Sequence, residues 1–445
     1  MSTPWLGEVP GCSRAAGENA PVGSAWVVPE VEGVLSAADV LASGASIAAV
    51  QRPDGMIPWF PGGHCDPWNH VEAAMALAVC GFVDAAEHAF DWLATNQLAD
   101  GSWFNYYLDQ GVKDPRLDTN VCAYVATGLY HHYLVTGDPR LLDRHWPMAQ
   151  RAVDFVLRWQ RPDGSVRWSL DPTGRPEGYA LLTGSSSVYL SLRCAVAAAD
   201  VLDRPRPDWE LAAGRLGHAV AHHPGAFAPK DEFAMDWYYP VLSGALSGER
   251  ARVRIDASWE KFVLDGLGVR CVSNSNWVTA AETAECAIAL TALGTTDRAR
   301  ELLAAGQGLR LSDGSYWTGM VYPDEVTFPG AERTTYTAAA MVLACDALSG
   351  ATGGSGLFTG HGLPAALDLA EPWCDDAGTG CPGGGDPSTG RGDAPQDAQA
   401  APAGLLRPLA RSDGMAPQLV GRAPAVGRIG KDVVDGEQAA RRDVR

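Results

Sequence analysis

One short phrase, Gln-x-x-Asp-Gly followed after a few residues by Trp, recurs along the chain and limits what it can fold into. Clear copies begin at Gln51, Gln97 and Gln160, and a looser copy begins at Gln307. The first two copies are 46 residues apart, and the last gap of 147 residues is close to three such steps. A period of about fifty residues indicates repeated supersecondary units, with two of the copies degenerate.

Apolar residues recur at helical spacing between these copies. Segment 71–79 is almost entirely apolar, as expected of a helix buried on all sides, whereas segment 85–93 mixes polar and apolar faces, as expected of a covering helix. The expected helices span about 35–51, 68–80, 82–97, 118–136, 139–160, 183–203, 208–222, 236–247, 249–262, 277–293, 296–308 and 331–349. Twelve helices make six hairpins, so the sequence predicts an all-α (α/α)6 toroid.

Composition sets the limits of this domain and the classes of partner. After Gly350 the chain becomes rich in Gly, Pro, Ala and Asp, so we predict a toroid over 32–349, a disordered tail over 350–445 and a loose arm over 1–31. The net charge of -19 disfavours nucleic acid as a partner. We find no apolar run long enough for a transmembrane helix. The first residues lack the features of a signal peptide, and cysteines such as Cys80 and Cys122 lie in apolar helical runs, so we expect a cytoplasmic protein with reduced thiols.

Connections of unequal length predict where the site lies. Some are minimal, such as Gly81 and 136–138, whereas others run for about 13 to 25 residues and carry aromatic residues or acids. If the helices alternate in direction, all long loops emerge on one face, where we expect the active site. The candidate catalytic acids on or just after these loops are Asp236, Glu282, Glu177, Asp66, Asp118 and Glu325.

Several of these acids also have a plain structural interpretation. Asp66 and Asp118 could cap the helices that follow them, with Pro67 as a first helical residue. Glu177 could be an isolated surface charge. Glu282 lies in an otherwise apolar helix, where an acid is either paired or faces a cavity.

Aromatic residues in the same loops are candidates for substrate contact. Asp236 is followed by three consecutive aromatic residues, which cannot all face the core from one helix, although packing at the rim of the toroid is the alternative. The expected substrate-binding residues are Trp59, Trp68, His70, Trp103, Tyr106, Trp237, Tyr238, Asn276, Trp277, Trp317, Arg333 and Tyr336. His64, Asp66 and His70 have metal-ligand side chains, but their spacing is not that of a zinc-binding helix, so we expect no metal and no cofactor.

A bowl lined by Trp, Tyr, Asn and carboxylates suits a small-molecule or oligosaccharide substrate, and two acids across a bond can cleave a glycoside. The same aromatic faces could stabilise a carbocation. We find no Gly-rich phosphate loop, no DDxxD cluster in the domain and no GxSxG elbow, which argues against phosphate chemistry and serine hydrolysis.

The repeated phrase, clearest at Gln97–Trp103, resembles the QW repeats of terpenoid cyclases and protein prenyltransferases. Stretches like Asp66–Leu77 and Asp236–Leu242 are similar to bacterial proteins labelled prenyltransferase. This resemblance implies a toroid that acts on an isoprenoid. The Asp-x-Asp-Asp protonation motif of the cyclases is missing, and the zinc ligands of the prenyltransferases cannot be placed.

The stretches Ala73–Trp103 and Tyr133–Gln160 resemble the hairpins of six-hairpin glycosidases of the glucoamylase type. That resemblance implies Glu177 as the general acid and a glutamate soon after the last Asp-Gly as the base, a place that Glu325 would have to fill. We therefore predict a carbohydrate-active hydrolase of six-hairpin type, with an isoprenoid enzyme as the alternative and a non-catalytic glycan-binding toroid as a third hypothesis.

Overall fold

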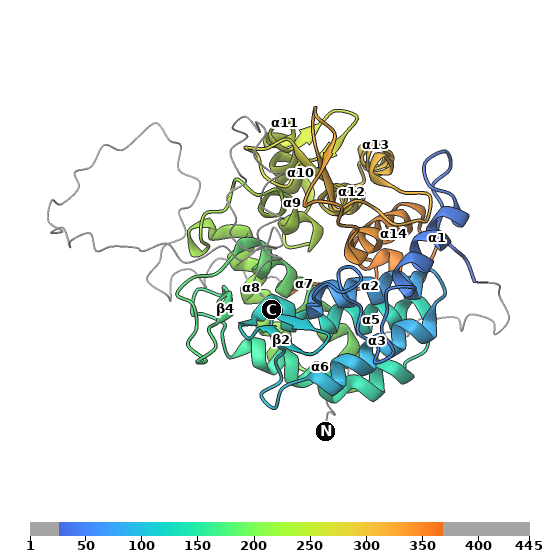
Figure 1. The fold of residues 1–445 in the computed structure, drawn as a ribbon. Helices are drawn as coiled ribbons and strands as arrows, with labels where there is room; N and C mark the ends of the chain where they lie inside the picture. Colours follow the sequence, from blue (N-terminus) through green and yellow to red (C-terminus); the bar gives the residue numbers. More distant parts are fainter. Residues whose placement is uncertain (1–25, 368–445) are drawn as a thin grey trace, which may run out of the picture.

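The computed structural model describes residues 26–367 (Figure 1). The rest of the predicted N-terminal arm, and the predicted disordered tail beyond residue 367, lie outside these residues. Within the described part no helix is long and apolar enough to cross a membrane.

A closed ring of buried helices forms the inner wall. Its members are α2 (Pro67–Val79), the short α4 (Thr119–Ala123) with α5 (Val125–Thr136), α7 (Leu182–Val201), α9 (Ala234–Leu242), α12 (Ala280–Ala292) and α14 (Thr335–Ser349). Each packs on the next, and α14 packs back on α2. All residues of α2 are buried, which explains why 71–79 carries almost no polar residues.

A second set of helices covers this ring from outside. These are α1 (Ala37–Ala48), α3 (Val83–Asn96), α6 (Arg140–Leu157), α8 (Pro207–His222), α10 (Gly248–Ala257) and α13 (Thr296–Gly306). Each of α3, α6, α8, α10 and α13 packs on the inner helix that precedes it, and α1 packs on α14 (Figure 1). The prediction of an (α/α)6 toroid is therefore confirmed.

The long loops carry short antiparallel strands and further small helices. The strands are β1 (Tyr106–Leu108), β2 (Gly111–Asp114), β3 (Leu117–Asp118), β4 (Ser169–Leu170), β5 (Val263–Leu264), β6 (Gly268–Val269), β7 (Trp277–Thr279), β8 (Gly319–Val321) and β9 (Val326–Thr327). They form the pairs β1–β2, β3–β4 and β5–β6 and the three-stranded sheet β7–β8–β9. The small helices are α11 (Trp259–Phe262), η1 (Pro224–Ala226), η2 (Gln307–Leu309) and η3 (Gly353–Gly356).

The repeated phrase fastens neighbouring outer helices together. Gln97 ends α3, and its Nε2 donates to the carbonyl oxygens of Gly101 and of Met148 in α6, both at 2.9 Å. A Cβ on Gly101 would lie 2.2 Å from the carbonyl oxygen of Arg151. Only glycine therefore allows this turn to pack so closely against the backbone of α6. Gln51 and Gln160 make the equivalent bonds. The Gln and Gly residues of the phrase thus fix the spacing of neighbouring outer helices.

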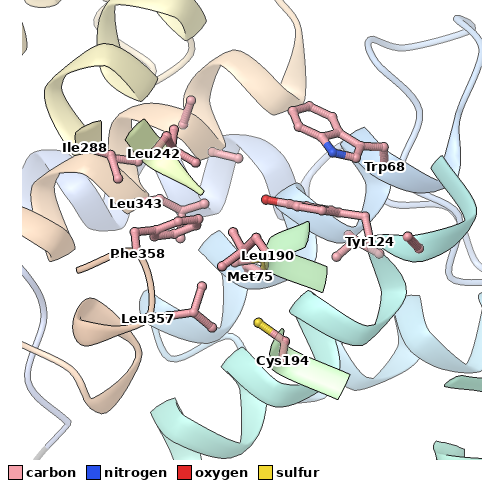
Figure 2. Close-up of a cluster of buried hydrophobic side chains, with 14 of the residues drawn as sticks. Trp68, Met75, Tyr124, Leu190, Cys194, Leu242, Ile288, Leu343, Leu357 and Phe358 are labelled. Atoms are coloured by element: carbon pink, nitrogen blue, oxygen red, sulfur yellow. The ribbon is translucent and has the colours of Figure 1, made fainter. Parts of the chain in front are cut away.

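The domain continues beyond the predicted boundary at residue 349. Figure 2 shows Leu357 and Phe358 packed among side chains of the inner helices, including Leu343 and Met75, and both are buried. The hydroxyl of Tyr130 donates to the carbonyl oxygen of Gly362 at 2.6 Å. The segment 351–367 therefore covers the end of the ring at which the inner helices finish.

Part of the predicted arm is also packed. The indole Nε1 of Trp26 donates to the carbonyl oxygen of Val79 at the end of α2. The seven cysteines of residues 26–367 are buried and unpaired.

Candidate active site

The inner helices begin at the end of the ring where the long loops enter, and four acids lie at these beginnings. Asp66 and Asp118 are the N-caps of α2 and α4, while Asp236 and Glu282 lie in the first turns of α9 and α12. The N-terminus of a helix carries partial positive charge, which favours an ionised carboxylate there. All four side chains are buried in the wall of the bowl.

Asp66 is held beside a cluster of aromatic rings. Its Oδ2 accepts from the indole of Trp59 at 2.7 Å, and its Oδ1 accepts from the amide of Asn69 at 2.9 Å. Burial raises the pKa of Asp66, although these hydrogen bonds oppose the change. The ring of Trp59 lies 6.0 Å from that of Tyr106 and 5.1 Å from that of Tyr336. Asp66 is thus a helix cap and also an acid beside the aromatic rings of the bowl, so the structural and the functional interpretation of this residue are compatible.

Asp118 and Asp236 line a hollow that Thr183 at the start of α7 also lines. Burial raises the pKa of each to about 6. Oδ2 of Asp118 accepts from the indole of Trp168 at 2.6 Å. Oδ1 of Asp236 accepts from the amide of Thr183 at 3.2 Å and also from its hydroxyl. Within residues 26–367, Oδ2 of Asp236 has no hydrogen-bond donor, so this oxygen is available to a ligand.

Glu282 is next to this hollow. Its carboxylate accepts from the hydroxyl of Thr279 and lies close to Cys271, a residue that lines the hollow. Glu282 also faces Tyr336, whose pKa its charge helps to raise. Asp236 and Glu282 therefore lie on adjacent inner helices beside one space.

Two further buried acids were not among the predicted site residues. Glu285 accepts from the hydroxyls of both Tyr238 and Tyr239, and burial raises its pKa to about 8. Glu72 in α2 is also buried, and burial together with the charges of Glu285 and Asp66 raises its pKa. A signal for Glu72 was available, since it is the one acid in the apolar segment 71–79. Trp168 could also have been identified from the sequence, because it is the tryptophan of the third copy of the repeated phrase.

Some predicted substrate contacts are internal supports instead. His70 is fully buried, with Nδ1 accepting from the amide of Ile57 and Nε2 at 2.9 Å from the carbonyl oxygen of Ala89. Trp103 is fully buried and its indole donates to Leu93. A side chain with its polar atoms engaged and no exposed surface fastens a loop to a helix and does not contact substrate.

Three more aromatic residues of that prediction are also enclosed. The indole of Trp237 donates to the carbonyl oxygen of Arg254, and its ring stacks on Phe262 with ring centroids 5.3 Å apart. Trp68 packs on Tyr124 with ring centroids 4.9 Å apart (Figure 2). Tyr238 is fully buried against Glu285. Consecutive aromatic residues on α9 therefore face different neighbours, and their contacts are those that the packing interpretation expects.

The remaining predicted residues lie on the loops. Glu325 is exposed in the turn between β8 and β9, and Arg333 is exposed and pairs with Asp313 at 2.9 Å, so neither faces the hollow. Glu177 is half-buried and does not line the hollow, so its position does not match the acid that the glucoamylase resemblance implies. Asn276 is exposed, Trp277 bonds the carbonyl oxygen of Phe328, and Trp317 lies near Arg333.

A metal site at His64, Asp66 and His70 does not fit this geometry, because both nitrogens of His70 are engaged by backbone groups. In the described part of the chain, no group of three His, Cys, Asp or Glu residues is placed to hold a metal ion.

Comparison with known proteins decides the family. No family model matches the chain. An MMP endo-(1,4)-3-O-methyl-alpha-D-mannosidase from Mycolicibacterium hassiacum is 52% identical over 341 residues, which cover 77% of this chain and 94% of that protein. The chain belongs to the glycoside hydrolase family of that enzyme.

Solved structures agree on the fold of this hydrolase. A wild-type glycosidase matches with a TM-score of 0.57 and 16% identity, over 70% of this chain and 97% of its own. A D-mannose isomerase matches with a TM-score of 0.55 and 12% identity, over 69% and 95%. At these identities the likeness shows the toroid alone. The prediction of a carbohydrate-active hydrolase of six-hairpin type is confirmed, and the isoprenoid alternative, which rested on the repeated phrase, has no support.

Proposed function

We propose that this hydrolase cleaves internal α-(1→4) bonds of an oligosaccharide built from 3-O-methylmannose. The observation that carries this proposal is the 52% identity to the mannosidase over 94% of that enzyme's length. The bowl itself suits such a substrate, because indole and phenol rings stack on the apolar faces of sugars and carboxylates accept from sugar hydroxyls.

Asp236 is the proposed general acid. A glycosidase acid must be protonated when substrate binds, and burial raises the pKa of Asp236 to about 6, so about half of the carboxyl groups carry a proton at pH 6 and about a tenth at pH 7. Asp236 lines the hollow, and its Oδ2, which accepts no hydrogen bond within residues 26–367, can donate that proton to the oxygen of the leaving sugar. Glu282 on the next inner helix is the proposed partner carboxylate, which attacks or activates water on the other side of the sugar ring.

The other two bowl acids hold substrate in this proposal. Asp66 accepts from Trp59 and Asn69, and Asp118 accepts from Trp168 and two backbone amides, so several donors fix each carboxylate in place. Rigidly oriented carboxylates are suited to accept hydrogen bonds from sugar hydroxyls.

The test is hydrolysis of α-(1→4)-linked 3-O-methylmannose oligosaccharides, with product lengths read by mass spectrometry. Wild-type enzyme should release internal fragments. Asp236→Asn and Glu282→Gln should each lower kcat by at least about a hundredfold, as expected for general acid–base groups, with little change in KM. Glu301→Gln on the outer surface of α13 is the matched control.

No cleavage by wild-type enzyme would refute the substrate. Cleavage that survives both substitutions but is lost in Asp66→Asn and Asp118→Asn would refute the assignment of roles. We further propose that the enzyme works in the reducing cytoplasm, which the seven unpaired buried thiols support.

A further inference from the structure

A groove on the side of the toroid meets the hollow at the proposed general acid. It runs between α8 and α10, where Val220 and Ala221 line one side and Arg250 and Ala257 the other. Lys230 and Asp236 belong to the walls of both the groove and the hollow. Asp236 thus lies between the two spaces.

The polar lining of this groove is dominated by hydrogen-bond donors. Arg250, Arg254, Lys230 and Lys261 line it, in a chain whose net charge is -19. Lys261 pairs with Asp231 at 3.4 Å. Within residues 26–367, none of the other three forms a salt bridge with a carboxylate.

Backbone contacts hold the two arginines in place. Arg254 donates to the carbonyl oxygens of Trp237 at 2.9 Å and Asp236 at 2.6 Å. Arg250 lies 3.3 Å from the ring of His222 and donates to the carbonyl oxygen of Ala221. Each guanidinium has five N–H groups, more than these contacts use, so donors remain for a ligand.

Most of the remaining lining is apolar and includes Phe227, Ala228, Pro229, Val253 and Ala257. Its side-chain acceptors are Ser258, Asp236 and Asp231, and Asp231 is already paired with Lys261. Lys and Arg donate hydrogen bonds and accept none, so the groove combines apolar surface with more side-chain donors than acceptors. An unmodified sugar chain presents many hydroxyl donors, and burying a donor without an acceptor is unfavourable.

An O-methylated sugar has the complementary chemistry. A methyl ether keeps an oxygen that accepts hydrogen bonds, has no donor and adds an apolar methyl group. We infer that this lateral groove binds the part of an O-methylated oligosaccharide that lies beyond the cleaved bond, with Arg and Lys donating to ether oxygens and the apolar side chains covering methyl groups. The bond to be cleaved then lies at Asp236, with sugars on one side in the hollow and on the other in the groove. This inference rests on the proposed function, and it explains how a bowl accepts a chain at an internal bond.

The test narrows the groove with Ala257→Trp, an exposed position on α10, and compares it with Ala304→Trp, an exposed alanine on α13 away from both cavities. The substrates are a tetrasaccharide and an octasaccharide of α-(1→4)-linked 3-O-methylmannose, together with the unmethylated octasaccharide. The readout is the ratio of kcat/KM for octasaccharide to that for tetrasaccharide.

Wild-type enzyme and Ala304→Trp should prefer the methylated octasaccharide to the tetrasaccharide by about tenfold, which corresponds to 1.4 kcal/mol. Ala257→Trp should lose most of that preference. Lys261→Met, a change of a half-exposed side chain that keeps the fold, should lower the preference about threefold. The unmethylated octasaccharide should gain little from its length in any variant.

An unchanged ratio in Lys261→Met and Ala257→Trp would overturn the inference, as would an equal gain from length in the unmethylated chain. If Ala257→Trp fails to fold, the ratio in Lys261→Met decides. Absence of hydrolysis of either methylated substrate by wild-type enzyme is a different result, because it refutes the proposed function itself.

Discussion

Replacing Thr183 by Val tests the electrostatics of the proposed general acid. The Thr183 hydroxyl donates to Oδ1 of Asp236, and the amide of the same residue donates to the same oxygen at 3.2 Å. Valine has nearly the same shape, keeps the amide and lacks the hydroxyl. The substitution therefore removes one hydrogen bond to the ionised form and leaves the packing of α7 almost unchanged.

The magnitude follows from the strength of such a bond. A hydrogen bond to a charged group contributes about 1.5 to 3 kcal/mol, and 1.36 kcal/mol corresponds to a tenfold change in acidity. Because the bond favours the carboxylate, its loss should raise the pKa of Asp236 from about 6 to about 7 or 8.

The assay is the pH dependence of kcat/KM, which reports pKa values of the free enzyme. A general acid works when protonated, so activity falls as the pH rises through its pKa. In Thr183→Val that alkaline fall should move to higher pH by the same amount. Thr291→Val is the control, since the Thr291 hydroxyl bonds only a backbone carbonyl in α12. An alkaline limb that stays in place, or moves to lower pH, would refute Asp236 as the general acid.

Three further results are expected. Burial raises the pKa of Asp236 from 3.8 to about 6, so its ionisation destabilises the fold as the pH rises through this range. Urea unfolding should therefore show that Asp236→Asn increases the free energy of unfolding by up to about 3 kcal/mol at pH 7 and by much less at pH 4. Equal gains at both pH values would contradict the raised pKa of Asp236. Gly101→Ala should destabilise the protein by several kcal/mol, whereas Gly137→Ala should cost about 1 kcal/mol. Both glycines have a positive φ, but only a Cβ at Gly101 would meet a backbone oxygen. If thermal unfolding shows the larger loss for Gly137→Ala, this contact is unimportant. Phe358→Ala should cost about 3 to 5 kcal/mol in chemical denaturation, and a cost under 1 kcal/mol would mean that segment 351–367 does not contribute to the core.

The fold was predictable because a local pattern repeats. Each copy of the Gln-x-x-Asp-Gly phrase makes a turn whose geometry depends on nearby residues, and helical periodicity identifies the segments between copies. Asp66 and Asp118 each had two alternative interpretations, as a helix cap and as an acid of the site, and the two are compatible. Because all inner helices begin at the bowl, a residue that caps one of them also faces the site.

The direction of individual aromatic side chains was not predictable in the same way. Trp237 and Tyr238 are adjacent, yet the ring of Trp237 packs on Phe262, whereas the hydroxyl of Tyr238 donates to Glu285. These two partners come from different parts of the chain. Glu177 and Glu325 were placed by resemblance to a known family, and in this structure neither residue lines the hollow. The direction of such a side chain depends on packing against other elements, which a local sequence pattern does not record.

The closure of the ring by α14 on α2 has a consequence for synthesis on the ribosome. The first hairpin, α2 with α3, emerges early, but one flank of α2 is covered only by α14, which is made about 270 residues later. Until then the growing chain is an open arc with an apolar edge at each end. Contacts between residues so far apart in sequence form slowly. The closing contact of the ring therefore forms only after α14 has been synthesised, and until then α2 lacks this packing partner.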